Sequence, residues 1–316
     1  MGYSRDLFRR ASFGLMTSAL ALTANPVRAD DVPASNITTS QIRPDGSETI
    51  SAQQDGTSRM TVAVAIGQQG PFRFLIDTGA QRSVLSHNVA NRLSLRAINQ
   101  ATVMSVAGSR DVDLVDVDAI QLGRRAWKGK GLPVLEESHL GADGIIGLDG
   151  LQGQKVQLDF RRNQITLAAS REEVRDTNGY EIVVSARQRH GELILTDADI
   201  DGVKVQVVID TGADISVGNR ALQRALGHMT PANTTHLQGV TGQIVPADIG
   251  YGKQLSVDRI TIRNVELAYT DSKTFSTLGL EKKPAVLLGM PALRLFDRVA
   301  IDFATRRVMF DMPDGL

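Results

Sequence analysis

The sequence has 316 residues, 42% of them apolar, with 35 lysines and arginines against 35 aspartates and glutamates, so its formal net charge is zero. A chain without excess positive charge lacks the basic surface that nucleic-acid phosphates require, which argues against a nucleic-acid partner. The absence of cysteine excludes disulfide bonds, thiolate metal ligands and a cysteine nucleophile. The length and the apolar content are typical of a globular protein with one large domain or two smaller ones.

Residues 1–29 have the three parts of a secretory signal peptide. Arginines near the start precede an apolar run from Ala11 to Ala24, and small residues follow, up to Ala29. The run is shorter than the about 20 residues that a membrane-spanning helix needs. We therefore expect cleavage after Ala29, a periplasmic or secreted product and no stable membrane anchor afterwards. Arg9-Arg10 leaves open whether export uses the general or the twin-arginine route.

Residues 30–56 are rich in Pro, Ser, Thr, Asp and Gly and have almost no apolar periodicity. Such a composition does not bury enough apolar surface to offset the entropy lost on ordering. We predict a mobile N-terminal tail over this range.

The remainder of the chain has the pattern of β-structure. Apolar-rich or alternating runs are separated by Gly, Pro and Asp turns. The predicted strands include 60–66, 72–76, 182–186, 193–198, 203–209 and 260–268. Short helices are predicted over 88–95, 148–153, 219–226 and 291–296, at matching places in the two halves. The pattern therefore predicts an all-β fold.

One half of the sequence repeats in the other. Residues 74–84 (FLIDTGAQRSV) return 133 positions later as residues 207–217 (VVIDTGADISV). The further matches, in the same order, are 105–108 with 239–242, 117–122 with 257–262, 145–148 with 287–290, and 156–160 with 299–303. This order indicates a duplicated unit. It predicts a first lobe over 57–168, a linker region over 169–190 and a second lobe over 191–316.

The tripeptide Asp-Thr-Gly lies at the centre of the strongest repeat. A single copy is best interpreted as a β-turn, because Asp and Gly both favour turns. Two copies arise by chance in roughly one such chain in a hundred. Each copy here also follows three apolar residues, precedes an Ala and is followed by a Ser-Val pair at the same spacing. We therefore interpret the doubled tripeptide as one shared site.

The chemistry of such a site follows from its two carboxyl groups. Two carboxylates about 3 Å apart do not both ionise, so the pair retains one proton. One member acts as a base toward a water molecule and the other as an acid toward a carbonyl oxygen. The threonine hydroxyls can join the two loops, and glycine allows their backbones to approach closely.

This order of motifs resembles the retropepsin-like branch of the aspartic proteases, in a single-chain form that contains both halves of a pseudo-dimer. The resemblance covers about 57–314. It rests on apolar-apolar-Asp-Thr-Gly-Ala, a later flap hairpin, apolar-apolar-Gly and a late strand, each of which occurs twice. It implies two similar β-barrel lobes related by a pseudo-twofold axis, with a cleft between them for an extended polypeptide. It also implies a monomer with no metal and no cofactor.

The resemblance assigns roles to individual residues. Asp77 and Asp210 become the catalytic pair, supported by Thr78, Gly79, Thr211 and Gly212. Gly108 and Gly242 match the flap tips, although they could equally be ordinary hairpin turns. The expected substrate-binding residues are Ala80, Gln81, Ala213, Asp214, Gly108 and Gly242.

Two departures from the family pattern affect the expected activity. Asp214 matches an aspartate that contacts substrate backbone in retropepsins, whereas the first lobe has Gln81. The halves of the cleft are therefore unequal, and we expect a directional substrate preference. Ala80 and Ala213 lack the hydroxyl that stabilises the ionised carboxylate in pepsin-like members, so the pKa values of the pair should be higher. We expect a pH optimum milder than strong acid.

The sequence thus predicts an exported aspartic endopeptidase that acts through Asp77 and Asp210. The alternative is a peptide-binding or scaffold protein that has retained the fold without turnover. A subunit that is processed, or held inactive by its N-terminal tail, also stays open. The five histidines have no His-Glu-x-x-His or other paired spacing, which argues against a zinc site.

Overall fold

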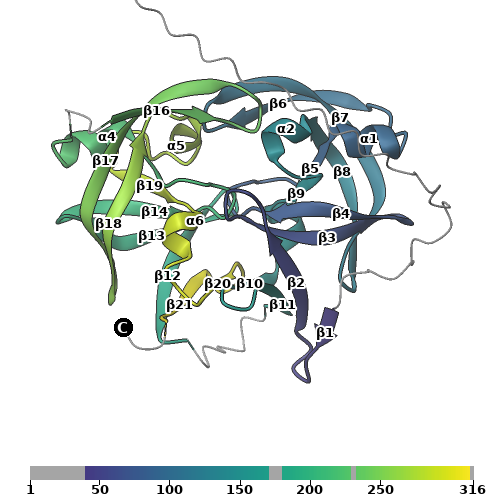
Figure 1. Ribbon diagram of the computed structural model, residues 1–316, viewed down its shortest axis with the longest axis horizontal. Helices are drawn as coiled ribbons and strands as arrows, with labels where there is room; N and C mark the ends of the chain where they lie inside the picture. Colours follow the sequence, from purple (N-terminus) through teal and green to yellow (C-terminus); the bar gives the residue numbers. More distant parts are fainter. Residues whose placement is uncertain (1–39, 171–179, 229–232, 314–316) are drawn as a thin grey trace, which may run out of the picture. The chain divides into compact units, whose positions relative to one another are not determined.

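The computed structural model describes residues 40–170, 180–228 and 233–313, which form twenty-one strands and six short helices (Figure 1). None of the helices within these ranges is long and apolar enough to cross a membrane. The predicted signal peptide, residues 1–29, lies outside the described residues.

The first lobe contains fourteen of these elements. They are β1 (Ser40–Ile42), β2 (Glu48–Gln54), β3 (Met60–Ile66), β4 (Gln69–Ile76), β5 (Val84–Ser86), α1 (His87–Arg92), β6 (Asn99–Ser105), β7 (Gly108–Leu122), β8 (Arg125–Leu135), α2 (Glu137–Leu140), β9 (Gly144–Ile146), α3 (Leu148–Leu151), β10 (Gln154–Asp159) and β11 (Gln164–Ala169).

The second lobe contains the remaining elements. They are β12 (Ile182–Arg189), β13 (Glu192–Ile200), β14 (Val203–Ile209), β15 (Val217–Gly218), α4 (Arg220–Ala225), β16 (Asn233–Gln238), β17 (Ile244–Val257), β18 (Ile260–Tyr269), α5 (Lys273–Thr277), β19 (Ala285–Leu288), α6 (Met290–Leu293), β20 (Arg298–Asp302) and β21 (Arg307–Asp311).

The two lobes repeat one plan, as the sequence predicts. In each, a parallel pair (β4 with β9, β14 with β19) forms the centre, and a short helix (α1 or α4) follows the next strand. The repeat extends to the helix caps. Ser86 Oγ accepts from the Val89 N–H, and Asn219 Oδ1 accepts from the Leu222 N–H, so both helices begin with a favourable N-cap side chain. The all-β, two-lobe prediction is confirmed.

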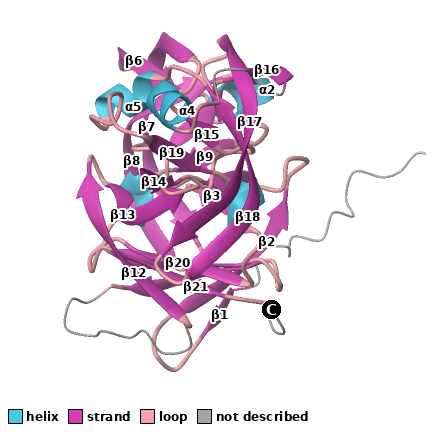
Figure 2. Cartoon of the chain, turned by 90° about the vertical axis from the view of Figure 1, so that its left-hand side faces the viewer, coloured by secondary structure: helices cyan, strands magenta, loops and turns pink. Residues whose placement is uncertain are grey.

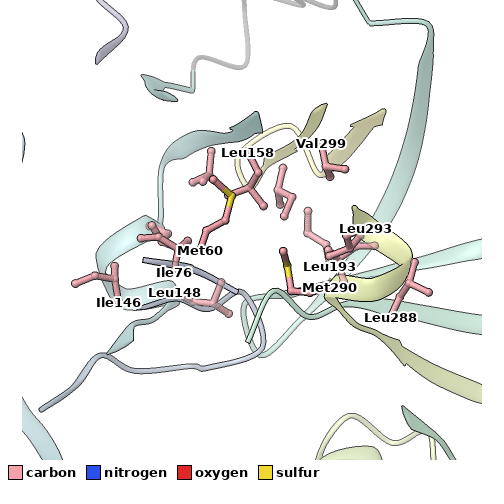
Figure 3. Close-up of a cluster of buried hydrophobic side chains, with 14 of the residues drawn as sticks. Met60, Ile76, Ile146, Leu148, Leu158, Leu193, Leu288, Met290, Leu293 and Val299 are labelled. Atoms are coloured by element: carbon pink, nitrogen blue, oxygen red, sulfur yellow. The ribbon is translucent and has the colours of Figure 1, made fainter. Parts of the chain in front are cut away.

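An antiparallel sheet joins the lobes. Strands β2, β11, β10, β20, β21 and β12 lie side by side in that order. At its centre, β10 of the first lobe pairs with β20 of the second, with Leu158 opposite Val299. Both side chains enter a buried cluster to which both lobes contribute, including Met60 and Leu193 (Figure 3). The lobes therefore share sheet hydrogen bonds and core.

The prediction of a mobile tail over 30–56 is wrong for residues 40–54. Strand β2 pairs with β11 through its first half and with β3 through its second, and the Ile50 side chain is 0% exposed. Hydrogen bonds in two sheets and a buried isoleucine offset the entropy cost that the polar composition suggested. Residues 30–39 lie outside the described residues.

The predicted linker over 169–190 also needs correction. Strand β12 pairs with β21 over 182–185 and then with β13 over 186–189, which is the counterpart of the way β2 joins two sheets. The second lobe therefore begins at residue 182 at the latest and not at 191. Residues 171–179 lie outside the described residues.

Strand β2 makes a testable contribution to stability. We expect Ile50→Ala to lower the free energy of unfolding by about 2–5 kcal/mol, because it leaves a cavity in the core. The matched control is Ile42→Ala, since Ile42 is 54% exposed, and its effect should stay within about 0.5 kcal/mol. Urea unfolding measures both changes, and equal effects would contradict the placement of β2 in the core.

Candidate active site

Each Asp-Thr-Gly loop begins where a central strand ends. Asp77 follows β4 and Asp210 follows β14. The Asp77 N–H donates to the Ile146 carbonyl at 3.0 Å, and the Asp210 N–H donates to the Leu288 carbonyl at 3.1 Å. Both aspartates are thus fixed by the parallel strand beside them, in the same way in each lobe.

The repeated apolar-apolar-Gly motif supports these loops from behind. A Cβ on Gly147 would lie 2.7 Å from the Ala80 carbonyl oxygen, and one on Gly289 would lie 2.9 Å from the Ala213 carbonyl oxygen. The next N–H group in each motif donates to that same carbonyl, at 2.8 Å and 2.9 Å. The approach leaves no space for a side chain, which explains the glycine in both copies.

The two threonines join the loops across the lobe boundary. Thr78 Oγ1 donates to the Ile209 carbonyl at 2.8 Å, and Thr211 Oγ1 donates to the Ile76 carbonyl at 2.7 Å. Each hydroxyl also accepts from the N–H of the other threonine, at 3.0 and 3.3 Å. Both residues are buried. Four hydrogen bonds therefore fix the distance between the loops.

The Asp77 and Asp210 carboxyl groups are close enough for each to act on the pKa of the other. Each packs against the glycine of the opposite loop. A Cβ on Gly79 would lie 2.7 Å from Asp210 Oδ1, and one on Gly212 would lie less than 3.0 Å from the Asp77 carboxyl carbon. Backbone donors fix one oxygen of each group: Gly79 and Ala80 donate to Asp77 Oδ1 at 2.8 and 3.1 Å, and Gly212 donates to Asp210 Oδ1 at 3.1 Å.

This environment makes the two carboxyl groups share a proton. Burial raises the pKa of Asp77 and, together with the negative charge of Asp77, raises the pKa of Asp210 to about 8. The backbone donors lower both pKa values but do not offset burial. Two adjacent carboxyl groups do not both ionise readily, so near neutral pH one group is charged and the other is protonated.

The two predicted flap tips meet each other. Ser105 Oγ lies 2.8 Å from Thr241 Oγ1, and Gln243 Nε2 donates to the Ser109 carbonyl at 2.9 Å. In the described part of the structure, the hairpins β6–β7 and β16–β17 lie at one end and the joining sheet lies at the other. Strands β4 and β14 lie between them (Figures 1 and 2). Gly108 and Gly242 have φ angles of 152° and 84° in these hairpins. Both glycines belong to tight hairpin turns that contact the other lobe.

Other predicted substrate-binding residues occupy equivalent places in the two loops. Gln81 and Asp214 are both exposed beside the Asp-Thr-Gly tripeptides. The Ala80 N–H donates to the Asp77 carboxyl group at 3.1 Å, and the Ala213 N–H donates to the Asp210 backbone carbonyl at 3.4 Å and also lowers the pKa of the Asp210 carboxyl group. The two halves therefore differ here mainly in sequence, with Gln81 in one and Asp214 in the other.

Sequence reasoning missed two charged residues at this site. Arg59 directly precedes β3 and Glu192 is the first residue of β13. Both lie close enough to act electrostatically on the aspartates. Aligning the repeats beyond the Asp-Thr-Gly block would have paired them, since they have the same separation of 133 as Thr78 and Thr211.

The described residues contain no group of three His, Cys, Asp or Glu side chains placed to hold a metal ion.

Comparison with known families agrees with this arrangement. A family model described as aspartyl protease matches residues 62–149 and 196–292. One segment falls in each lobe, each contains one Asp-Thr-Gly loop, and together they cover more than half of the chain. A comparison with curated proteins gives no match. The chain belongs to the aspartyl protease family, with one copy of the family's unit in each lobe.

Proposed function

We propose that this protein is an endopeptidase that hydrolyses peptide bonds in extended polypeptide segments through Asp77 and Asp210. The proposal depends on one observation: the two lobes present a pair of half-buried carboxyl groups to each other, each packed against the glycine of the opposite Asp-Thr-Gly loop. Such a pair has a base and an acid side by side at the same pH, which is what addition of water to an amide requires.

The reaction follows from the shared proton. The ionised aspartate removes a proton from water as the water oxygen bonds to the peptide carbonyl carbon, and the protonated aspartate gives its proton to the carbonyl oxygen. The resulting diol then returns one hydroxyl proton to the second aspartate, while the first gives its proton to the nitrogen and the C–N bond breaks. Neither aspartate bonds to the substrate, and both end as they began.

The test is hydrolysis of an unstructured protein by the purified chain in water enriched in ¹⁸O, between pH 4 and 7. We expect new C-termini that carry one ¹⁸O atom, and none with the Asp77→Asn/Asp210→Asn double variant purified in parallel. Equal cleavage by both proteins would identify a contaminating protease. Saturable peptide binding without cleavage would favour the peptide-binding or scaffold alternative.

We also propose that the protein is exported and acts as a monomer. Export is supported by the signal-peptide pattern of residues 1–29. The monomer is supported by the site itself, because one chain supplies both halves of the carboxyl pair. N-terminal sequencing of protein recovered from the periplasm or medium should give Asp30 first, and light scattering should give the mass of one chain.

A further inference from the structure

The pseudo-twofold relation breaks down at one pair of equivalent positions beside the aspartates. Arg59 precedes buried Met60 at the start of β3, and Glu192 is followed by buried Leu193 in β13. A symmetric site would carry the same charge on both sides. Here the duplicated positions carry opposite charges. Arg59 interacts electrostatically with Asp77, and Glu192 interacts most strongly with Asp210.

Arg59 acts on the Asp77 side. Its guanidinium donates to the Gly212 carbonyl at 3.4 Å and to the Leu140 carbonyl at 3.0 Å. Gly212 is the residue whose backbone packs directly against the Asp77 carboxyl group. The positive charge accordingly lowers the pKa of Asp77. Only 13% of the Arg59 side chain is exposed, so solvent screens this charge weakly.

The charge of Arg59 is partly compensated. Asp55 forms an ion pair with it at 2.8 Å, and the charged Arg294 lies near Asp55 in turn. One negative charge thus stands between two guanidinium groups. The charge of Arg59 still lowers the pKa of Asp77, so by itself it favours the ionised form of that aspartate.

Glu192, the counterpart of Arg59 in the second lobe, interacts more strongly with Asp210 than with Asp77. It is 3% exposed, and its Oε2 atom makes no hydrogen bond within the described part of the chain. Burial, the charge of Asp210 and then that of Asp77 raise its pKa to about 8, while an interaction with the Gln81 amide lowers it. A buried carboxyl group with an unpaired oxygen is costly, so its presence beside two aspartates calls for a role.

Electrostatic coupling between two groups is reciprocal. The pKa values of Asp210 and Glu192 are both raised to about 8, so the two groups titrate in the same pH range, and there the charge of either one makes the other hold its proton to higher pH. Arg59 has the opposite effect on the first aspartate. The two sides of the site therefore push the pKa values of the pair apart.

We infer that Arg59 and Glu192 are positioning residues that make the two aspartates unequal, so that Asp77 is the base toward water and Asp210 is the acid toward the carbonyl. This inference rests on the proposed function and assigns the individual roles within it. It explains why an apparently symmetric pair can hold its proton on one defined side before substrate binds.

The test compares pH profiles of kcat/KM for the full chain and for single variants. Glu192→Gln, which cannot ionise, should shift the alkaline limb to lower pH by about half a unit, or about threefold in rate on that limb, and leave the acid limb in place. Glu192→Asp is the rescue variant and should restore part of the shift. Arg59→Gln should shift the acid limb to higher pH by a similar amount, and Arg59→Lys should restore it.

A measurement that needs no activity separates failure of the inference from failure of the proposed function. Carboxyl ¹³C resonances of Asp77 and Asp210, assigned by their loss in the Asn variants, report each proton directly. We expect Asp210 to titrate at lower pH in Glu192→Gln, and Asp77 at higher pH in Arg59→Gln. Unchanged titrations of both aspartates would overturn the inference, even if the protein cleaves peptides. The expected shifts would support unequal roles for Asp77 and Asp210, even if the protein cleaves no peptide.

Discussion

Asp77→Asn and Asp210→Asn should each lower kcat by about 10³-fold or more, because each removes one partner in proton transfer. The asparagine in place of Asp77 still accepts from the Gly79 and Ala80 N–H groups but takes no proton from water. The asparagine in place of Asp210 still donates a hydrogen bond but has no acidic proton to give. Since the pair acts as a unit, the two losses should be similar and the double variant should lose little more.

Stability measurements distinguish this loss from unfolding. The pKa of Asp210 is raised in the folded state from 3.8 to about 8, so the folded protein binds a proton that the unfolded chain releases. The associated stability is complete below about pH 4 and is lost as the pH rises toward 8. Asp210→Asn lacks this loss, so it should unfold at the same or a higher temperature than the wild type at pH 8.

Asp118→Asn is the matched control for these variants. Asp118 is an exposed aspartate on β7, and its replacement should leave kcat within about twofold, as expected for a surface substitution. Peptide hydrolysis measured at several substrate concentrations separates kcat from KM. A large loss in the control, or near-normal kcat in either Asn variant, would contradict the assignment of the pair.

The two lobes and the carboxyl pair could be predicted because their signals are local and doubled. Each Asp-Thr-Gly loop lies within an eleven-residue block of which seven residues are identical in the two copies, and the geometry of a short loop depends mainly on its own residues. The strands β3, β14 and β18 likewise have local apolar-rich or alternating patterns. The structure places these elements within a residue or two of the predicted positions.

Strand β2 escaped prediction for a physical reason. It has Ile50 and Ala52 among polar residues, and its partner β11 lies more than a hundred positions away. The first half of β2 is held by this distant pairing and by burial of Ile50, neither of which has a local signature. The same holds for Glu192, because a glutamate at a strand start is unremarkable in sequence. Only its burial beside two other carboxyl groups gives it significance.

The close approach of the loops sets the final prediction, which concerns Gly212. A Cβ at this position would lie less than 3.0 Å from the Asp77 carboxyl carbon, closer than real side-chain contacts allow. In Gly212→Ala, either the Asp77 carboxyl group or the whole second loop must move. A displacement of about 1 Å in a reacting group costs about 10²-fold in rate, so kcat should fall at least that much while both aspartates are still present.

Gly56→Ala is the matched control, because a Cβ on Gly56 meets nothing within 4 Å, and it should leave kcat unchanged. In Gly212→Ala the threonine hydrogen bonds resist movement of the loop, so the strain should also lower the melting temperature by several degrees, about 1–3 kcal/mol for an overpacked site. The Asp77 and Asp210 carboxyl groups should then titrate closer to independent values, because separation weakens their coupling. Full activity in Gly212→Ala would mean that the reaction does not need the carboxyl groups in contact, and the shared-proton mechanism would lose its basis.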